Sequence, residues 1–345
     1  MSIRTIKDIA KICNVSTSTV SRAINDESGI NKETKARILK VVEEYNFIPN
    51  SSARDLKKLE SNTIALLIQG ISNPFFQGMF AVFERELKKL KFSFSIHSVG
   101  EEQDEIDVAA ELIKEKHLKG LIFLGGSMNG NAKKREQLNI PSVRCSGTLL
   151  PDVQGYDGTS NAIDDEEESY RIVNYLCNKG HRKIAVIISH GKDKSIAALR
   201  MQGYRRALEE NQIPYDPKLI YTTDNAVEDF SMQNGYITTK KLLESGIKFT
   251  ALYASSDTLA FGAYKAIYEY GKKIPDDYSV VGFDGIEMGK YYCPSLTTLT
   301  QPVEEMAKTA IDQLMKAIHE EEIKKQIVFQ GILTERESVK NIYQS

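Results

Sequence analysis

The sequence predicts an α/β protein in which a small N-terminal three-helix unit precedes a larger body of doubly wound parallel sheets. Two observations predict this class. Apolar residues recur at helical spacing through the first 45 residues, and beyond residue 62 short apolar runs alternate with helical patterns. We expect a head at residues 1–49, a linker at residues 50–62 and a body at residues 63–345.

The first helix of the head is expected to begin near Ile6 and to end at Asn14, because asparagine tolerates the left-handed conformation. Thr5 and Asp8 have the spacing of a capping box at its start. Its apolar face consists of residues at positions i, i+3, i+4 and i+7: Ile6, Ile9, Ala10 and Cys13.

A second helix is expected from Ser16, a good N-cap, to about Ile24. Val15 and Val20 have the spacing of a hydrophobic staple. Its outward face carries hydroxyls and one cation: Thr17, Ser18, Ser21 and Arg22. With a third helix at about 32–45, the layout is that of a helix-turn-helix, whose exposed polar face suits DNA phosphates and base edges. The alternative is a three-helix unit with a merely polar surface.

The linker reads NSSARDLKKLESN. Pro49 disfavours helix at Ile48, and Asn50 is able to cap a short helix that carries Ala53 and Leu56. The alternative is a polar tether, since so short a helix is marginal in water.

In the body, apolar runs predict buried parallel strands: TIALLI, FSFSI, LKGLIFL, RKIAVII, KFTALYA and YSVVGF. Helical patterns fall near residues 78–90, 106–116, 166–178, 200–210, 235–243 and 259–270. Ligands of such sheets bind beyond the carboxyl ends of the strands, which directs attention to the loops there.

Composition limits the class of protein. The chain has 41% hydrophobic and 27% charged residues and no apolar run of membrane-spanning length, so we expect no membrane partner. The N-terminal residues show no signal-peptide core, which predicts a cytoplasmic protein. The first 60 residues hold 11 Lys and Arg against 8 Asp and Glu, a mild basic excess that permits a nucleic-acid-binding head on an acidic body. The four cysteines are far apart and predict buried thiols.

The head resembles the lactose-repressor/galactose-repressor (LacI/GalR) family of bacterial transcription regulators. The resemblance rests on TIKDIAKICNVSTSTVSRAIN followed by FIPNSSARDL. It implies base reading by Thr17, Ser18 and Arg22 and a hinge helix whose Leu56 enters the minor groove of operator DNA. The full DNA-binding set that it implies is Thr5, Ser16, Thr17, Ser18, Thr19, Ser21, Arg22, Asn25, Asn50, Ala53 and Leu56.

The resemblance extends over the body through ISNPFF, GHRKIAVI, SVVGFD and PSLTTLTQP. It implies a periplasmic-binding-protein-like body of two subdomains, at about 63–161 with 292–321 and 162–291 with 322–345, and crossovers near Ala162, Tyr291 and Glu322. It also implies a homodimer on a pseudo-palindromic operator and a small effector, most simply a sugar, between the subdomains. The effector-binding set is Phe75, Phe76, Ser146, Arg200, Phe230, Ser256 and Asp284.

Two departures leave the identity of the effector open. Ser256 precedes Asp257 where many relatives have asparagine, and Cys145-Ser146-Gly147 replaces a segment that often supplies an acidic side chain.

Other functions have weaker support in the sequence. The motifs of P-loop enzymes, dinucleotide-binding enzymes, serine hydrolases and zinc proteases are missing, so we expect no enzyme activity, no metal and no cofactor. The acidic run at 164–168 suits a helix start better than a metal. A sugar-binding module without DNA function, an activator, and a regulator controlled by a partner protein remain as alternatives to a repressor.

Overall fold

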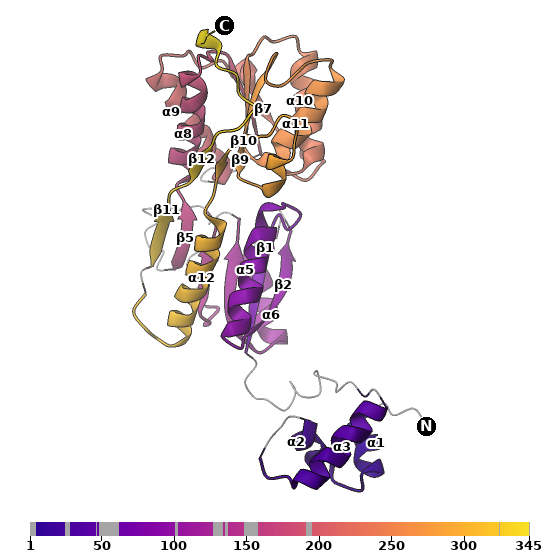
Figure 1. Ribbon diagram of the computed structural model, residues 1–345. Coiled ribbons are helices and arrows are strands. Elements are labelled where there is room, and N and C mark those ends of the chain that lie inside the picture. The colour runs from indigo at the N-terminus through magenta and orange to yellow at the C-terminus, as the bar shows by residue number, and fades with distance from the viewer. Residues whose placement is uncertain are drawn as a thin grey trace. The chain divides into compact units, whose positions relative to one another are not determined.

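The computed structural model describes residues 5–24, 28–45, 47, 62–100, 103–126, 134, 137–147, 158–190, 195–323 and 325–344. The chain divides into two compact units, residues 1–61 and 62–345 (Figure 1). Each unit is described by itself.

The first unit contains three helices, as the periodicity predicts: α1 (Ile6–Ile12), α2 (Thr17–Ile24) and α3 (Lys32–Glu44). They enclose a small core of buried side chains: Ile9, Ala10, Cys13, Val20, Ala23 and Ile38. At the start of α1, the Asp8 carboxylate accepts the Thr5 backbone N–H at 3.0 Å. The Asn31 side chain accepts the Glu33 N–H at 2.8 Å and so caps α3.

The turn between α1 and α2 follows from two polar residues. Asn14 has φ 49°, the left-handed conformation expected of an asparagine that ends a helix. The Ser16 hydroxyl then accepts the Thr19 N–H at 3.1 Å and caps α2. The two helices therefore meet at a tight, fixed turn.

The first subdomain of the larger unit has a parallel sheet in the order β11-β5-β4-β3-β1-β2. Its strands are β1 (Thr63–Gln69), β2 (Ser93–Val99), β3 (Leu118–Leu124), β4 (Ser142–Cys145), β5 (Thr159–Ile163) and β11 (Gln326–Phe329). Its helices are α5 (Phe75–Lys89), α6 (Glu105–Glu115) and α12 (Val303–Ile318). Alternate residues of β1 face opposite sides of the sheet: Leu66 packs in the core with α5, and Leu67 packs in the core with α6.

The second subdomain has a sheet in the order β12-β10-β9-β8-β6-β7, in which only the edge strand β12 is antiparallel. Its strands are β6 (Ile184–Ile188), β7 (Ile220–Thr222), β8 (Ala251–Ala254), β9 (Ser279–Asp284), β10 (Thr297–Thr300) and β12 (Ile332–Thr334). Its helices are α8 (Asp165–Asn178), α9 (Ile196–Glu210), α10 (Met232–Glu244) and α11 (Asp257–Glu269). Short 3₁₀ turns occupy Pro217–Leu219, Glu287–Lys290 and Ile342–Gln344.

The chain crosses between the two sheets three times, and two crossings lie elsewhere than the resemblance implied. The first follows β5, close to the expected Ala162. The second follows β10, not Tyr291, because β10 pairs with β9 of the second sheet before the chain leaves it. The third lies between β11 and β12, not near Glu322, because β11 pairs with β5 of the first sheet. The run IVFQGIL is thus divided between both sheets.

Helices α8 and α9 pack closely because α9 carries a glycine at their contact. A Cβ atom on Gly203 would lie 2.2 Å from the Glu166 carbonyl oxygen and 2.7 Å from the Tyr170 nitrogen, both backbone atoms of α8. The backbones of the two helices are therefore in direct contact at this glycine.

We predict that Gly203→Ala lowers the free energy of unfolding by about 1–3 kcal/mol or more, since the added methyl overpacks two helix backbones. Gly78→Ala in α5 is the matched control, because its Cβ would meet only the movable Val303 side chain at 3.1 Å. That control should be neutral or stabilising, since alanine favours helix by about 1 kcal/mol over glycine. Urea denaturation of both variants tests this, and equal midpoints would contradict the close packing.

Candidate functional site

The structure presents two candidate sites, and the first is the outer face of α2. Thr17, Ser18 and Arg22 are exposed there, while Val20 and Ala23 are buried in the head core. The Ser16 hydroxyl lies 2.7 Å from that of Ser18 and 2.8 Å from that of Thr19. Thr19 and Ser21 are half-buried, and Thr5 is exposed at the start of α1. Asn25, Asn50, Ala53 and Leu56 lie outside the described residues.

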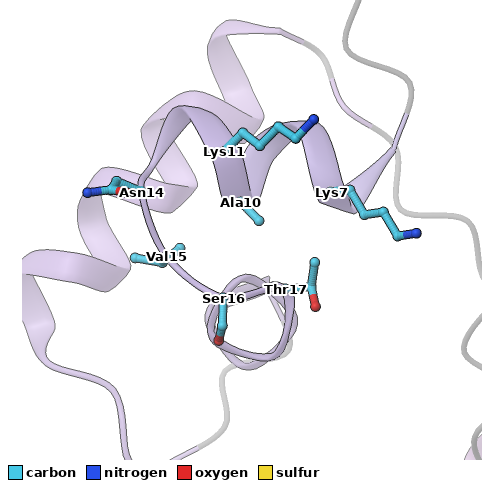
Figure 2. A pocket seen from close by; sticks show the side chains of 7 residues that line it. All are labelled: Lys7, Ala10, Lys11, Asn14, Val15, Ser16 and Thr17. Carbon is cyan, nitrogen blue, oxygen red and sulfur yellow. The ribbon is translucent and has the colours of Figure 1, made fainter.

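A shallow hollow beside this face adds two cations that the sequence reasoning missed. It is lined by Lys7, Ala10, Lys11, Asn14, Val15, Ser16 and Thr17. Figure 2 shows Lys7 and Lys11 extending from α1, with Ser16 and Thr17 at the beginning of α2 across the hollow from them. Their i, i+4 spacing on the polar side of α1 was the available signal. Two ammonium groups beside hydroxyls form a surface that suits a phosphate backbone.

The second candidate site is a cavity between the two subdomains of the larger unit. It lies beyond the carboxyl ends of the strands, as expected for such sheets. Its lining is Gln69, Gly70, Asn73, Phe75, Phe76, Gly125, Gly126, Ser146, Ile196, Arg200, Phe230, Asp284 and Gln301. The hydroxyl of Ser72 in the first subdomain, next to the lining residue Asn73, donates to the carboxylate of Glu228 in the second.

Six of the seven predicted effector residues line this cavity, and Ser256 does not. Ser256 is fully buried, and its hydroxyl accepts the Leu259 N–H at 3.2 Å. It is the N-cap of α11, and it is not among the residues that line the cavity. The sequence could not separate the two roles, because serine at the end of a strand suits both.

Arg200 is the charged centre of the cavity wall. Its Nε donates to the Asp165 carboxylate at 2.9 Å, and one terminal nitrogen donates to the Ser255 carbonyl. The other terminal nitrogen lies 3.6 Å from the Asp284 carboxylate. The guanidinium plane also covers the Phe283 ring, 3.6 Å from its centroid. Arg200 therefore has a structural counterion and also faces the cavity.

Asp284 ends β9 with φ 113°, an unfavourable conformation for a residue with a side chain and one often found at functional sites. Its carboxylate accepts from the Gln301 amide at 2.9 Å and from the side chain of Asn73. Burial raises the pKa of Asp284 to about 6, although Arg200 and Gln301 act in the opposite direction. Asn73 and Gln301 were missed as individual residues, although both lie in runs that carry the family resemblance.

Aromatic rings form the apolar part of the cavity wall. Phe75 and Phe76 begin α5, and their rings meet edge to face with centroids 5.2 Å apart. Phe230, which precedes α10, lines the cavity from the second subdomain and is half-buried. A cavity with aromatic faces and a small set of convergent polar groups is typical of a small-ligand site.

Ser146 directly follows β4 and lines the cavity, and Arg144 within β4 is a buried cation. Ser146 has φ 57°, and its N–H donates to the Asn161 carbonyl at 2.9 Å. The Arg144 guanidinium forms an ion pair with Glu105 and donates to the Gly125 carbonyl at 2.9 Å. The serine thus offers a hydroxyl where the resemblance implied an acidic side chain.

The acidic run begins α8, as predicted. The Asp164 side chain accepts the N–H groups of Glu166 and Glu167 at 3.1 and 3.0 Å. Within the described ranges, no three His, Cys, Asp or Glu side chains are grouped as a metal site.

No helix in the described part of the chain combines the length and the apolar character needed to span a bilayer.

Comparisons with known proteins match a known family to part of each unit. Residues 5–50 match the family "Bacterial regulatory proteins, lacI family", and residues 173–339 match "Periplasmic binding protein-like domain". The HTH-type transcriptional regulator MalR of Clostridium butyricum is 32% identical over 98% of this chain and 99% of its own length. The ribose operon repressor of Haemophilus influenzae is 33% identical over 91% of this chain and 92% of its own.

Solved structures give the same result. A LacI-family regulator from Enterococcus faecium, with bound ribose, is 28% identical and has a TM-score of 0.70 over 81% of this chain and 99% of its own. With its helix-turn-helix head and two-subdomain body, the chain belongs to the lacI family of bacterial regulatory proteins.

Proposed function

We propose that this protein is a DNA-binding transcription repressor whose operator affinity is controlled by a small ligand bound between the two subdomains. One observation carries the proposal. A head that exposes hydroxyls and Arg22 on α2 is joined in one chain to a body with a polar and aromatic cavity between two sheets. Transcription regulators are also the class of the relatives.

For the DNA site, we assign base contacts to Thr17, Ser18 and Arg22, which α2 exposes together. Arginine reads guanine in the major groove, and hydroxyls accept or donate to either base edges or phosphates. We assign phosphate contacts to Thr5, Ser16, Thr19 and Ser21, together with Lys7 and Lys11 across the hollow. Asn25, Asn50, Ala53 and Leu56 complete the proposed set by the family resemblance.

For the ligand, we propose a sugar or a sugar derivative. Asp284 and Asn73 would exchange hydrogen bonds with vicinal hydroxyls, and the rings of Phe75, Phe76 and Phe230 would cover apolar ring faces. Ser146 and Arg200 would supply further polar contacts. The names of two similar proteins, a ribose operon repressor and a ribose-bound regulator, support this class of ligand.

We further propose a homodimer that acts in the cytoplasm. A single small head has little surface for specific affinity, and a two-fold dimer doubles the contacts on a pseudo-palindromic operator. Residues 1–49 would form the DNA-binding head, residues 50–62 the hinge and residues 63–345 the ligand-binding and dimerisation body.

For Arg22→Ala, we predict a loss of about 1–3 kcal/mol for operator DNA, concentrated at one base position in each half-site, because a bidentate base contact is removed. Fluorescence anisotropy with operator and random duplexes measures the difference. Lys40→Ala in α3 removes the same charge from an exposed position of the head and serves as the control. Equal weakening of operator and random DNA by Arg22→Ala would remove Arg22 from base reading.

Asp284→Ala should abolish the ligand response and leave operator affinity without ligand close to that of the parent chain. Each hydrogen bond from a ligand hydroxyl to the carboxylate contributes about 1.5–3 kcal/mol. Calorimetry with the sugar that a thermal-shift screen identifies gives the affinity. Glu287→Ala, which removes an exposed carboxylate three residues further on, is the control. Unchanged affinity in Asp284→Ala would exclude this residue from the site.

Ligand affinity should also fall as the pH is lowered through about 6, the raised pKa of Asp284. Below that pH the carboxyl is protonated and loses acceptor capacity for ligand hydroxyls; above it the carboxylate is fully formed. Titrations at pH 5 and pH 7.5 test this, and equal affinities would contradict an acceptor role for Asp284.

A further inference from the structure

The third crossover, between β11 and β12, is held by two side chains of α8. The Gly331 N–H donates to the Glu168 carboxylate at 2.7 Å, and the Gly331 carbonyl accepts from the Arg171 guanidinium at 2.9 Å. Arg171 also forms an ion pair with Glu168. The Glu168 side chain is only 2% exposed, so a charged group is buried against the backbone of a connecting segment. We call Glu168 and Arg171, with Gly331 between them, the crossover clamp.

Little space is left beside Gly331 within the clamp. A Cβ atom on Gly331 would lie 2.9 Å from the Leu299 side chain and 3.2 Å from the Glu168 carboxyl carbon. Because no side chain intervenes, both polar groups of Gly331 are bound by α8. A buried carboxylate with an ion-pair partner and a backbone donor makes strong hydrogen bonds. The crossover is therefore fixed to the second subdomain at one residue, directly where the chain leaves the first sheet.

The same helix holds the cavity arginine. Asp165, in the first turn of α8, accepts from Arg200 at 2.9 Å, and Glu168 lies less than one helical turn further on. Arg200 lies on α9, which Gly203 brings into backbone contact with α8. Arg200, Asp165 and Glu168 thus belong to one closely packed helix pair, joined by an ion pair and by backbone contact. A displacement of Arg200 toward a ligand therefore moves the helix that carries the clamp.

The second crossover has a comparable connection to the cavity. Gln301 directly follows β10 and donates to Asp284, which faces Arg200. The first crossover leads directly into Asp165. The first two crossovers are thus joined directly to the pair of Arg200 and Asp284. The third is joined to that pair through α8, which carries both Glu168 and Asp165. Glu168 and Arg171 of the clamp do not line the cavity. They differ from the other two connections because they bind the backbone of the crossover, at Gly331.

We propose that Glu168, supported by Arg171, is a positioning residue that sets the angle between the two subdomains through Gly331. In the liganded chain it transmits the movement of Arg200 to the first subdomain, and this second statement rests on the proposed function. Coupling of this kind needs two subdomain arrangements that differ in their contacts. The clamp favours the arrangement seen here, and its loss releases the other.

The test measures the subdomain spacing in the full-length chain without any ligand or DNA. Spin labels are placed at Lys88→Cys in α5 and Glu209→Cys in α9, two exposed positions in different subdomains, with the exposed Cys293 changed to Ser. Pulsed electron resonance on protein diluted with unlabelled chain gives the distance distribution. We expect one narrow distribution for the parent chain, and a broadened or second distribution for Glu168→Met, which removes the acceptor but keeps the side-chain volume.

Hydrogen exchange supplies a second readout at the clamp itself. The Gly331 amide should exchange roughly ten-fold faster or more in Glu168→Met, the scale on which a hydrogen bond to a charged group acts. Glu167→Met is the matched control: this neighbour on α8 is half-exposed, and its carboxylate pairs with Arg206 on α9. It should leave both the distances and the Gly331 exchange unchanged.

Arg171→Met is a second variant for the case that Glu168→Met fails to fold. Arg171 is partly exposed, and its guanidinium donates to the carbonyl of the same Gly331. A folded Arg171→Met or Glu168→Met variant with the parent distance distribution would overturn the proposal, even if its thermal stability were lower. Neither readout depends on DNA or ligand binding. A failure here is therefore distinguishable from a failure of the proposed function, which operator binding by the parent chain would reveal.

Discussion

The buried charge of Arg200 is the constraint on which the architecture of the body depends. A guanidinium that is 5% exposed is stable only if carboxylates and carbonyls replace its water. Asp165 at the start of α8 and Asp284 at the end of β9 supply that charge, and Phe283 supports the guanidinium plane. Since these groups come from different elements of the second subdomain, neutralising one arginine fixes α8, α9 and β9 relative to one another. The same requirement places a strained aspartate and a cation at the cavity.

The described part of the head is stabilised by a small apolar core and not by buried charges. This core holds the polar helix α2 in place. Three short helices bury Ile9, Val20 and Ile38, and caps at Ser16 and Asn31 satisfy their first backbone donors. The exposed residues of α2 are not part of this core, so their side chains are free to contact DNA. The body, by contrast, places its functional residues in the same buried network that stabilises it. Changes at the cavity should therefore affect both stability and ligand binding, whereas changes on α2 should affect DNA alone.

Sequence reasoning predicted the head helices, most of the body helices and six of the residues that line the cavity, because apolar spacing, caps and family motifs report on these. It failed where buried residues are polar. β5 (TSNAI) and β10 (TTLT) have few apolar residues, yet they are buried: the amides of Asn161 and Gln313 hydrogen-bond at 3.0 Å, and Thr298 donates to Asp257 at 2.6 Å. The second crossover was misplaced because β10, a polar strand, pairs with β9 before the chain leaves the second sheet. The third was misplaced because Gln326 of β11 pairs with Ser160 of β5, and pairing between such distant segments leaves no local pattern. Ser256 caps a helix and Gln301 lines the cavity. Residue type alone does not distinguish these two roles.

Selection of duplexes from a random library by the full-length protein shows whether the chain reads a two-fold symmetric DNA sequence through α2. We expect enrichment of a pseudo-palindromic sequence with two half-sites, and no enrichment by residues 62–345, which form the body as a compact unit. Recovery of unenriched or asymmetric sequences by the full-length chain, at a salt concentration where it still binds DNA, would show that α2 does not read DNA in this way.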